Sequence, residues 1–297
     1  MTDWLNNSDL DRVAELRTDP AWVLAAWVDP DAVLLRVGDA SVETGPDGSL
    51  LTRRAEGEFD PERHYLLGRI DGRPWFATRA PEDQQLTVLR SIMDDLPTAA
   101  LQAAFTAVGL AAWHAGSGFC PRCGAATKAV HGGQARRCTN CGTELYPRTD
   151  PAVIVAIIDP DGRLLLGRPA VWAPGRYSVF AGFVEMGESL EQTVHREMAE
   201  EVGLDLTGIT YLGSQPWPFP RSLMLGFLAR TGRAEPVPAE GEIEAARWFT
   251  HDQLVAAMAT GEVILPPYTS IARRMIESWL HGSLGHPGTD QRVSGKR

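Results

Sequence analysis

The sequence has no apolar run that approaches the roughly 18–20 residues required by a membrane-spanning helix. Its first residues, Met1–Asp9, also lack the positive and apolar regions of a secretory signal peptide. These two absences argue against a membrane protein and against a secreted one. We therefore expect a cytoplasmic protein that has no membrane partner.

An excess of positive charge is also missing, because 28 Lys and Arg stand against 38 Asp and Glu, a formal net charge of -10. Long nucleic acids bind proteins mainly through Lys and Arg side chains that neutralise phosphates. The overall charge therefore argues against a DNA-binding protein. A phosphorylated small molecule is still a suitable ligand where metal ions supply positive charge locally.

The length of the chain, 297 residues, suggests two domains and a small third module. Hydrophobic residues make up 44% and charged residues 22%, which is typical of soluble globular proteins. In the first region, apolar segments predict strands at residues 33–37, 65–70 and 75–78. Apolar spacings of three and four then predict helices within residues 86–114, interrupted at Pro97.

The remainder of the chain divides further. The β-branched run at residues 153–158 predicts a strand, and residues 164–166 follow as its hairpin partner. Beyond residue 285 the sequence is rich in Gly, Pro and polar residues, which is typical of disorder. We expect four parts: an N-terminal α+β domain at 1–115, a cysteine module at 116–146, a third domain at 147–282 and a disordered tail at 283–297.

All four cysteines of the chain fall in one short module. Cys120 and Cys123 form one C-x2-C-G knuckle, and Cys138 and Cys141 form a second, with fourteen residues between Cys123 and Cys138. Thiolates at positions i and i+3 of a tight turn occupy two corners of a zinc tetrahedron, so two such turns complete a four-thiolate site. A closed site of this kind is structural by default. The spacing therefore predicts structural Zn²⁺, and the alternative is redox-active cysteines or no site.

A cluster of acidic residues lies on a predicted helix that begins at Ser189 and ends at Gly203. Glu197, Glu200 and Glu201 stand at positions i, i+3 and i+4, and therefore on one face of that helix. Three like charges this close repel one another unless a cation lies among them. Hard divalent ions such as Mg²⁺ or Mn²⁺ prefer oxygen ligands and meet this need. The alternative is an ordinary solvated acidic face.

The whole segment from Gly182 to Leu204 fits the pattern G-x5-E-x7-R-E-U-x-E-E-x-G-U, where U is an apolar residue. On this pattern the chain resembles the Nudix hydrolases over about residues 147–280. The resemblance implies a Nudix α/β/α sandwich around a mixed sheet, preceded here by a zinc ribbon and an α+β N-terminal domain. It also implies hydrolysis of a diphosphate linkage with the help of divalent ions, which neutralise phosphate oxygens and activate a water.

The resemblance also implies roles for individual residues. Glu200 matches a further metal ligand or the base that orients the water, and Arg196 and Glu188 match a structural ion pair that fixes the loop. The implied ligands of Mg²⁺ or Mn²⁺ are the carboxylates of Glu197, Glu201 and Glu242 and the backbone carbonyl of Ala181.

A second motif bears on the substrate. Ser214–Ser222 reads SQPWPFPRS, in which three prolines alternate with two aromatic residues and keep the backbone stiff. Alone, this string is typical of a rigid edge loop packed on the core. At its place after Gly203 it resembles the SQPWPFPxS signature of the NADH pyrophosphatase branch of the Nudix family. That branch also has a four-cysteine zinc ribbon between an N-terminal domain and the Nudix domain, so the resemblance spans nearly the whole chain.

Enzymes of that branch cleave NAD(H) into nicotinamide mononucleotide and AMP, remove NAD caps from RNA 5′ ends and work as homodimers. The resemblance implies the same substrates and the same self-association for this chain. Tyr146 and Phe183 are expected to flank the nicotinamide ring, because flat aromatic side chains stack on heterocycles. One departure is Gly133-Gln134 in the ribbon, where some members have a substrate-contacting Glu, so the resemblance does not imply a contact from the ribbon to the nucleotide here. The implied substrate-binding residues are Arg90, Tyr146, Phe183, Gln215, Pro216, Trp217, Pro218, Phe219, Pro220, Arg221, Ser222 and Ala272.

Two other functions remain open on the sequence. One is a different Nudix activity, such as hydrolysis of ADP-ribose or of dinucleoside polyphosphates. The other is a non-enzymatic zinc-ribbon module that senses nucleotides or binds nucleic acid. The complete set of three helical carboxylates and the acidic charge of the chain disfavour the second.

Overall fold

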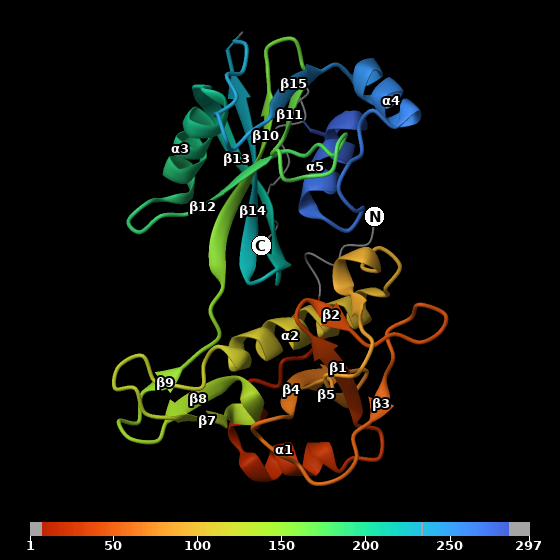
Figure 1. Cartoon of the computed structure of the whole chain (residues 1–297), viewed down its shortest axis with the longest axis vertical. Coiled ribbons are helices and arrows are strands. Elements are labelled where there is room, and N and C mark those ends of the chain that lie inside the picture. The colour runs from red at the N-terminus through yellow and green to blue at the C-terminus, as the bar shows by residue number, and fades with distance from the viewer. Residues whose placement is uncertain (1–7, 233, 285–297) are drawn as a thin grey trace, which may run out of the picture. The chain divides into compact units, whose positions relative to one another are not determined.

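The computed structural model describes residues 8–232 and 234–284. The predicted disordered tail lies, from residue 285 onward, outside the described residues. The contacts divide the chain into two compact units (Figure 1). Unit 1 holds the residues up to Thr149 together with Pro216–Ser222, and unit 2 holds Asp150–Gln215 and the residues from Leu223.

Unit 1 is built on a six-stranded sheet in the order β4-β5-β1-β2-β6, with β3 paired to β1. Strands predicted at residues 33–37, 65–70 and 75–78 are confirmed as β1, β4 and β5. The bounds are β1 Val33–Gly38, β2 Ser41–Val42, β3 Arg53–Arg54, β4 Tyr65–Ile70, β5 Arg73–Arg79 and β6 Thr87–Val88, with 3-10 turns η1 Leu16–Thr18 and η2 Leu89–Ser91.

Helices cover both faces of this sheet because its strands are apolar on both faces. Leu35 and Val37 of β1 pack on one side with helix α2, Thr98–Ala115. Leu34 points to the other side and packs with helix α1, Pro20–Trp27. The sheet of unit 1 is therefore buried on both faces.

The prediction of helices within residues 86–114 is correct for the second part and wrong for the first. Helix α2 begins directly after Pro97, as expected. The preceding residues instead form strand β6, paired with β2, and the 3-10 turn η2. A helix of eleven residues before a proline is marginal by itself, and pairing at the sheet edge replaces it. Leu89 and Met93 still reach the core.

The cysteine module is a small three-stranded antiparallel sheet in unit 1, with β7 Thr127–Val130, β8 Ala135–Cys138 and β9 Glu144–Leu145. The 3-10 turn η3, His131–Gly133, joins β7 to β8. Gly133 has a φ of 86°, and a β-carbon there would lie 2.8 Å from the ring of Tyr65 in β4. Only glycine fits both the backbone and the space, so the turn packs closely against the main sheet of unit 1.

Unit 2 is a sheet in the order β13-β14-β10-β11-β15, with β12 paired to β10. The predicted strand and its hairpin partner are confirmed as β10 and β11, in which Ile157 pairs with Leu165. The bounds are β10 Asp150–Ile158, β11 Leu164–Arg168, β12 Phe180–Phe183, β13 Leu206–Trp217, β14 Ser222–Thr231 and β15 Ala245–Phe249, with helices α3 Leu190–Val202, α4 His251–Thr260 and α5 Ile271–Leu280.

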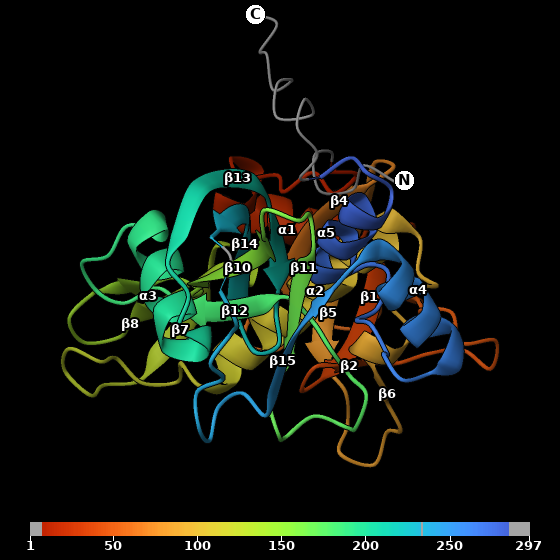
Figure 2. The ribbon, with the colours of Figure 1, turned by 90° about the horizontal axis from the view of Figure 1, so that it is seen from above.

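Alternate residues of β10 point to opposite faces of this sheet. Val153, Val155 and Ile157 pack with α3. Ile154 and Ile158 pack in the other cluster, with α4 and α5. Figure 2 shows α3 and α5 on opposite sides of the strands. Unit 2 is therefore the α/β/α sandwich expected from the resemblance. No helix within residues 8–232 and 234–284 has the length and apolar character needed to cross a bilayer.

Candidate active site

Helix α3 carries the acidic cluster, and its ends are fixed by local interactions. Ser189 and Gln192 form a capping box, in which each side chain bonds the backbone N–H of the other residue. Gly203 ends the helix with a left-handed φ of 65°. Val194 and Met198 are fully buried against the sheet. The helix is thus anchored at both ends and along one face, which fixes the direction of its carboxylates.

Arg196 organises the segment before the helix, as predicted. Its Nε and Nη2 donate to the two carboxylate oxygens of Glu188 at 2.6 and 2.9 Å. Bonding to Arg196 holds the pKa of Glu188 at about 2, well below the ordinary value. Nη2 also donates to the backbone carbonyl of Phe183 at 2.9 Å. The ion pair therefore joins the helix to β12 and to the loop between them.

The same guanidinium contacts two of the three helical carboxylates. Nη1 of Arg196 donates to Glu197 and to Glu200, each at 3.0 Å. The Glu200 side chain is 58% exposed, whereas that of Glu197 is 14% exposed. Burial is the main cause that raises the pKa of Glu197. Glu197 is therefore the more desolvated carboxylate of the two.

Among the three helical carboxylates, Glu201 has the surroundings least favourable to a negative charge. Its Oε2 is buried and has no hydrogen-bond partner among the described residues. Burial, followed by the negative charges of Glu197, Glu242 and Glu200, raises the pKa of Glu201 to about 8. An unpartnered carboxylate oxygen beside other carboxylates fits a hard divalent cation, which supplies the missing positive partner. The donor set of Glu197, Glu201 and Glu242 therefore suits Mg²⁺ or Mn²⁺.

The side chain of Glu197, in α3, packs against the backbone of strand β12. A β-carbon at Gly182 would overlap the Glu197 carboxylate, so the side chain fills the space that any other residue would occupy. Ala181, the neighbour of Gly182, pairs with Ile154 of β10 and is fixed in the sheet. The glycine thus lets a carboxylate approach the β12 backbone closely.

The acidic side chains do not converge as tightly as the cysteines. Among the described residues, only the four cysteines form a group of three or more potential ligands whose donor atoms all lie within 4.8 Å of one another. Glu197 and Glu200 instead share Arg196. The structure brings the predicted carboxylates into one region, but it does not draw their oxygens into a tight cluster.

The four sulfurs of the ribbon fit the predicted zinc site. The Sγ atoms of Cys120 and Cys141 are 3.7 Å apart, and those of Cys123 and Cys138 are 3.4 Å apart. Sulfurs about 2.3 Å from a tetrahedral zinc lie roughly 3.8 Å from one another. The observed spacing is close to that value. The positions of the four sulfurs therefore fit a structural zinc site.

The aromatic residues of the SQPWPFPRS segment pack within unit 1. Trp217 and Phe219 lie edge to face, with ring centroids 5.1 Å apart. Phe219 also meets Phe105 of α2 edge to face at 5.8 Å. The guanidinium of Arg90 lies 4.9 Å from the centroids of both loop rings. Arg90 and the two aromatic residues are therefore brought together as one packed cluster.

Gln215 of β13 and Ala272 of α5 both lie in unit 2. The Gln215 side chain is fully buried. Its Nε2 donates to the carbonyl of Thr269 at 2.9 Å, and its Oε1 accepts from the N–H of Ile271 at 2.6 Å. Ala272 is 6% exposed. The Gln215 carboxamide is thus engaged in ordering the segment that precedes α5.

The two aromatic residues expected at the nicotinamide ring are both open to solvent. Tyr146 is 61% exposed, and its hydroxyl donates to Glu144 at 2.5 Å. Phe183 ends strand β12 and is 56% exposed. Exposed rings at these positions are available for stacking on a ligand.

The sequence reasoning missed a buried network in unit 1. Arg136 donates to Glu62 at 2.8 Å and lies 2.8 Å from Nδ1 of His114. The His114 Nε2 donates to the carbonyl of Gly133 at 2.7 Å, and the ring stacks on Tyr65 with centroids 4.0 Å apart. These residues are separated by up to 74 positions, so no local pattern signals the network.

Comparisons with known proteins agree with these features. Residues 148–268 match the NUDIX domain family, and residues 117–146 match the NADH pyrophosphatase zinc ribbon domain. The NAD-capped RNA hydrolase NudC of Mycobacterium tuberculosis (strain ATCC 25618 / H37Rv) is 40% identical, over 93% of this chain and 94% of the relative. The NudC protein of Deinococcus radiodurans is also 40% identical, over 82% of this chain and 91% of its own. A solved NUDIX hydrolase from Nitrosomonas europaea is 23% identical with a TM-score of 0.38, over 55% of this chain and 93% of that one.

Proposed function

Because the chain belongs to the Nudix family, in the branch of the NAD-capped RNA hydrolases, we propose that it hydrolyses the pyrophosphate bond of NAD(H). The products are nicotinamide mononucleotide and AMP, and the same bond is cleaved when an NAD cap is removed from an RNA 5′ end. The observation that carries this proposal is the buried, unpartnered Oε2 of Glu201 within the Nudix motif. That oxygen lacks a positive partner, which a divalent cation would supply.

The proposed ligands of Mg²⁺ or Mn²⁺ are Glu197, Glu201, Glu242 and the backbone carbonyl of Ala181. When bound, the divalent ions neutralise charge on the pyrophosphate and lower the pKa of a water. Glu200, which is exposed and held by Arg196, is proposed to orient that water or to complete the ligand set. The capped helix and the Arg196–Glu188 pair hold these carboxylates in place before the substrate arrives.

The residues that contact the dinucleotide are proposed from the motif and from exposure. Tyr146 and Phe183 are assigned to the nicotinamide ring because both rings are exposed. Arg90, the segment Gln215–Ser222 and Ala272 are assigned to the rest of the substrate. Since the Gln215 side chain is buried and bonded to backbone, its part is to order the segment before α5.

We further propose a homodimer, and a cytoplasmic location in which the zinc thiolates stay reduced. We also propose the domain bounds 1–115, 116–146 and 147–282, of which the last two enclose the two family matches. Light scattering coupled to size-exclusion chromatography tests the assembly: a mass of one chain at micromolar concentration contradicts the dimer.

The activity is tested by incubating purified protein with NADH and either Mg²⁺ or Mn²⁺ and separating the products by chromatography. We expect nicotinamide mononucleotide and AMP in equal amounts, and no products in the presence of a chelator. ADP-ribose, the substrate of the alternative Nudix activity, is the matched comparison. A higher kcat/KM on ADP-ribose than on NADH overturns the proposed substrate.

A further inference from the structure

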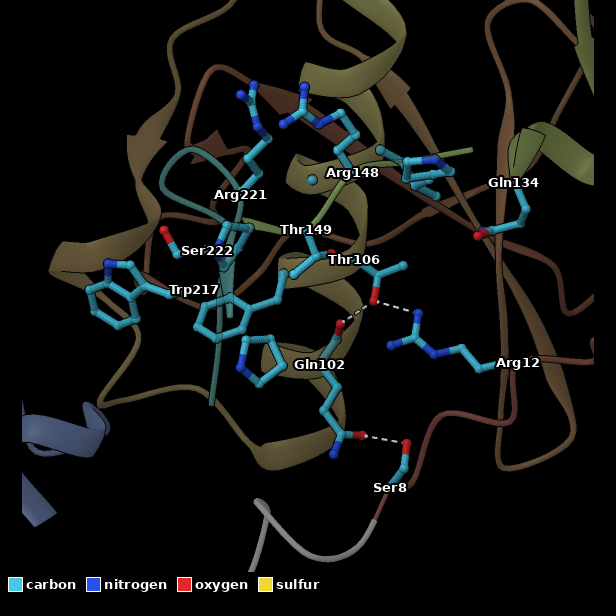
Figure 3. A pocket seen from close by; sticks show the side chains of 16 residues that line it. Ser8, Arg12, Gln102, Thr106, Gln134, Arg148, Thr149, Trp217, Arg221 and Ser222 are labelled. Carbon is cyan, nitrogen blue, oxygen red and sulfur yellow. Dashed lines mark hydrogen bonds between the residues drawn. The ribbon is translucent and has the colours of Figure 1, made fainter. Parts of the chain in front are cut away.

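Unit 1 contains a pocket with two arginines, Arg12 and Arg148, that have no part in the proposed reaction. It has a volume of about 430 Å³ and is lined by residues of helix α2, of the segment that leaves the ribbon and of the loop Pro216–Ser222 (Figure 3). Three arginines, Arg12, Arg148 and Arg221, line it. The sixteen lining residues include no Asp or Glu.

The absence of acidic residues from this wall is notable, because the chain carries 38 acidic and 28 basic residues. The three arginines also come from segments far apart in the sequence, so only the fold brings them to one pocket. A wall that bears three positive charges and no negative ones concentrates anions locally. Although the whole chain is acidic, the wall of this pocket is therefore lined by basic side chains.

Arg12 is held in place by α2. Its Nη1 donates to the hydroxyl of Thr106 at 2.9 Å, and that hydroxyl donates to the backbone carbonyl of Gln102 at 2.8 Å (Figure 3). Arg12 forms no ion pair with a carboxylate among the described residues. Its guanidinium has five N–H donors and keeps most of them for a ligand.

Guanidinium groups with a planar set of donors bind phosphate oxygens particularly well. We propose that this pocket binds a backbone phosphate of the RNA that follows the NAD cap. This inference rests on the proposed function, and it adds a site for the RNA part of the substrate. The chemistry recognised is a nucleotide phosphate, which the RNA chain or a free nucleotide can supply.

Two observations favour the RNA chain as the source. The pocket shares five residues with the loop proposed to contact the dinucleotide: Pro216, Trp217, Pro218, Arg221 and Ser222. If the dinucleotide binds at that loop as proposed, the RNA attached to it would begin next to the pocket. The scissile phosphates already have the acidic cluster of α3 and its ions as partners, so the arginines serve a different phosphate.

The test compares NADH with NAD-capped single-stranded RNA as substrates of Arg12→Gln and Arg148→Gln. Each change removes one positive charge and leaves a polar side chain, and neither residue belongs to the proposed catalytic set. We expect kcat/KM on NADH to stay within about twofold and kcat/KM on capped RNA to fall about tenfold, the loss of one charge-assisted contact. Arg17→Gln, in the same N-terminal segment but outside this pocket, is the matched control and should change neither value.

Binding without turnover separates this proposal from the proposed function. Fluorescence anisotropy with uncapped, 5′-monophosphorylated RNA measures affinity whether or not the protein hydrolyses NADH. Each substitution should weaken binding about tenfold and reduce the slope of log affinity against log salt by about 0.7. Arg12→Lys should restore part of the affinity.

Three results overturn the proposal. Equal losses on NADH and on capped RNA assign the pocket to the dinucleotide. Unchanged RNA affinity in both variants excludes the pocket from RNA binding. Complete displacement of RNA by millimolar AMP or inorganic phosphate, with no effect of the arginine substitutions on capped-RNA turnover, assigns the site to a free nucleotide phosphate.

Discussion

The Glu197 carboxylate occupies the space directly above Gly182, where any side chain would otherwise begin. The contact joins α3 to β12, the strand that supplies Ala181. Gly182 is therefore part of the geometry of the proposed metal site although it has no functional group. Its role is to leave room for a carboxylate.

Gly182→Ala should displace Glu197 and lower activity without unfolding the protein. The backbone at residue 182 does not need a positive φ, so alanine causes no strain there apart from the overlap. A displacement of about 1 Å at a catalytic group can reduce the rate roughly 100-fold, and we expect a loss of 10- to 100-fold in kcat. Gly232→Ala, with open space around its β-carbon, is the control. Full activity of Gly182→Ala would show that Glu197 is not held by this contact.

Glu201→Gln should abolish most of the activity, because Gln keeps the shape and removes the charge that binds the cation. We expect kcat to fall at least about 100-fold. Circular dichroism should show an unchanged fold, since Gln is as good a helix former as Glu. Glu191→Gln, an exposed change in the first turn of the same helix, should keep full activity. Activity of Glu201→Gln within a few-fold of the parent contradicts the ligand assignment.

Cys120→Ser should lower both the zinc content and the melting temperature, since structural zinc contributes directly to folding. Cys120 is buried in the ribbon. A loss of roughly 2–3 kcal/mol corresponds to a decrease of about 5–10 °C for a unit of this size. Metal analysis and thermal unfolding measure the two effects together. Arg122→Ala, between the first two cysteines, is the control, and a zinc-free variant with unchanged melting would argue against a structural role.

Acid should weaken unit 1 through His114. Its Nε2–H donates to Gly133 and its Nδ1 accepts from Arg136, so the ring is neutral in the fold. Burial first, and then the charge of Arg136, lower the pKa of His114 from 6.5 to about 4. The unfolded chain therefore binds an extra proton between these values. The contribution of His114 to the free energy of unfolding is fully present above pH 6.5. It decreases as the pH falls towards 4, by up to about 3 kcal/mol in total.

Denaturant unfolding of the wild type and of His114→Gln at pH 7 and pH 4.5 measures this effect. Gln has the donor and the acceptor that the site needs but does not titrate. The variant should therefore lose less stability on acidification than the wild type. Any loss of zinc at low pH is common to both proteins and cancels in the comparison. Equal losses in the two proteins would exclude His114 as the cause.

Local sequence patterns correctly predicted most of the helices and strands that the sequence analysis named. The strand β10, the hairpin to β11 and the capped helix α3 follow from alternation, turn residues and caps, which act between neighbours in the chain. The one clear error is the segment before Pro97. Its helical spacing of Leu89 and Met93 is real, but pairing of β6 with the distant β2 decides its structure.

The sequence by itself determined the reaction class and the zinc site, because the Nudix motif puts three carboxylates on one helix and the two knuckles put four cysteines on two tight turns. Only the tertiary structure decided which carboxylate is buried, what the aromatic loop packs against and where three arginines meet. These features depend on desolvation and on contacts between residues a hundred or more positions apart, such as Arg90 with Trp217. Local sequence patterns indicate neither the desolvation of a side chain nor its long-range contacts.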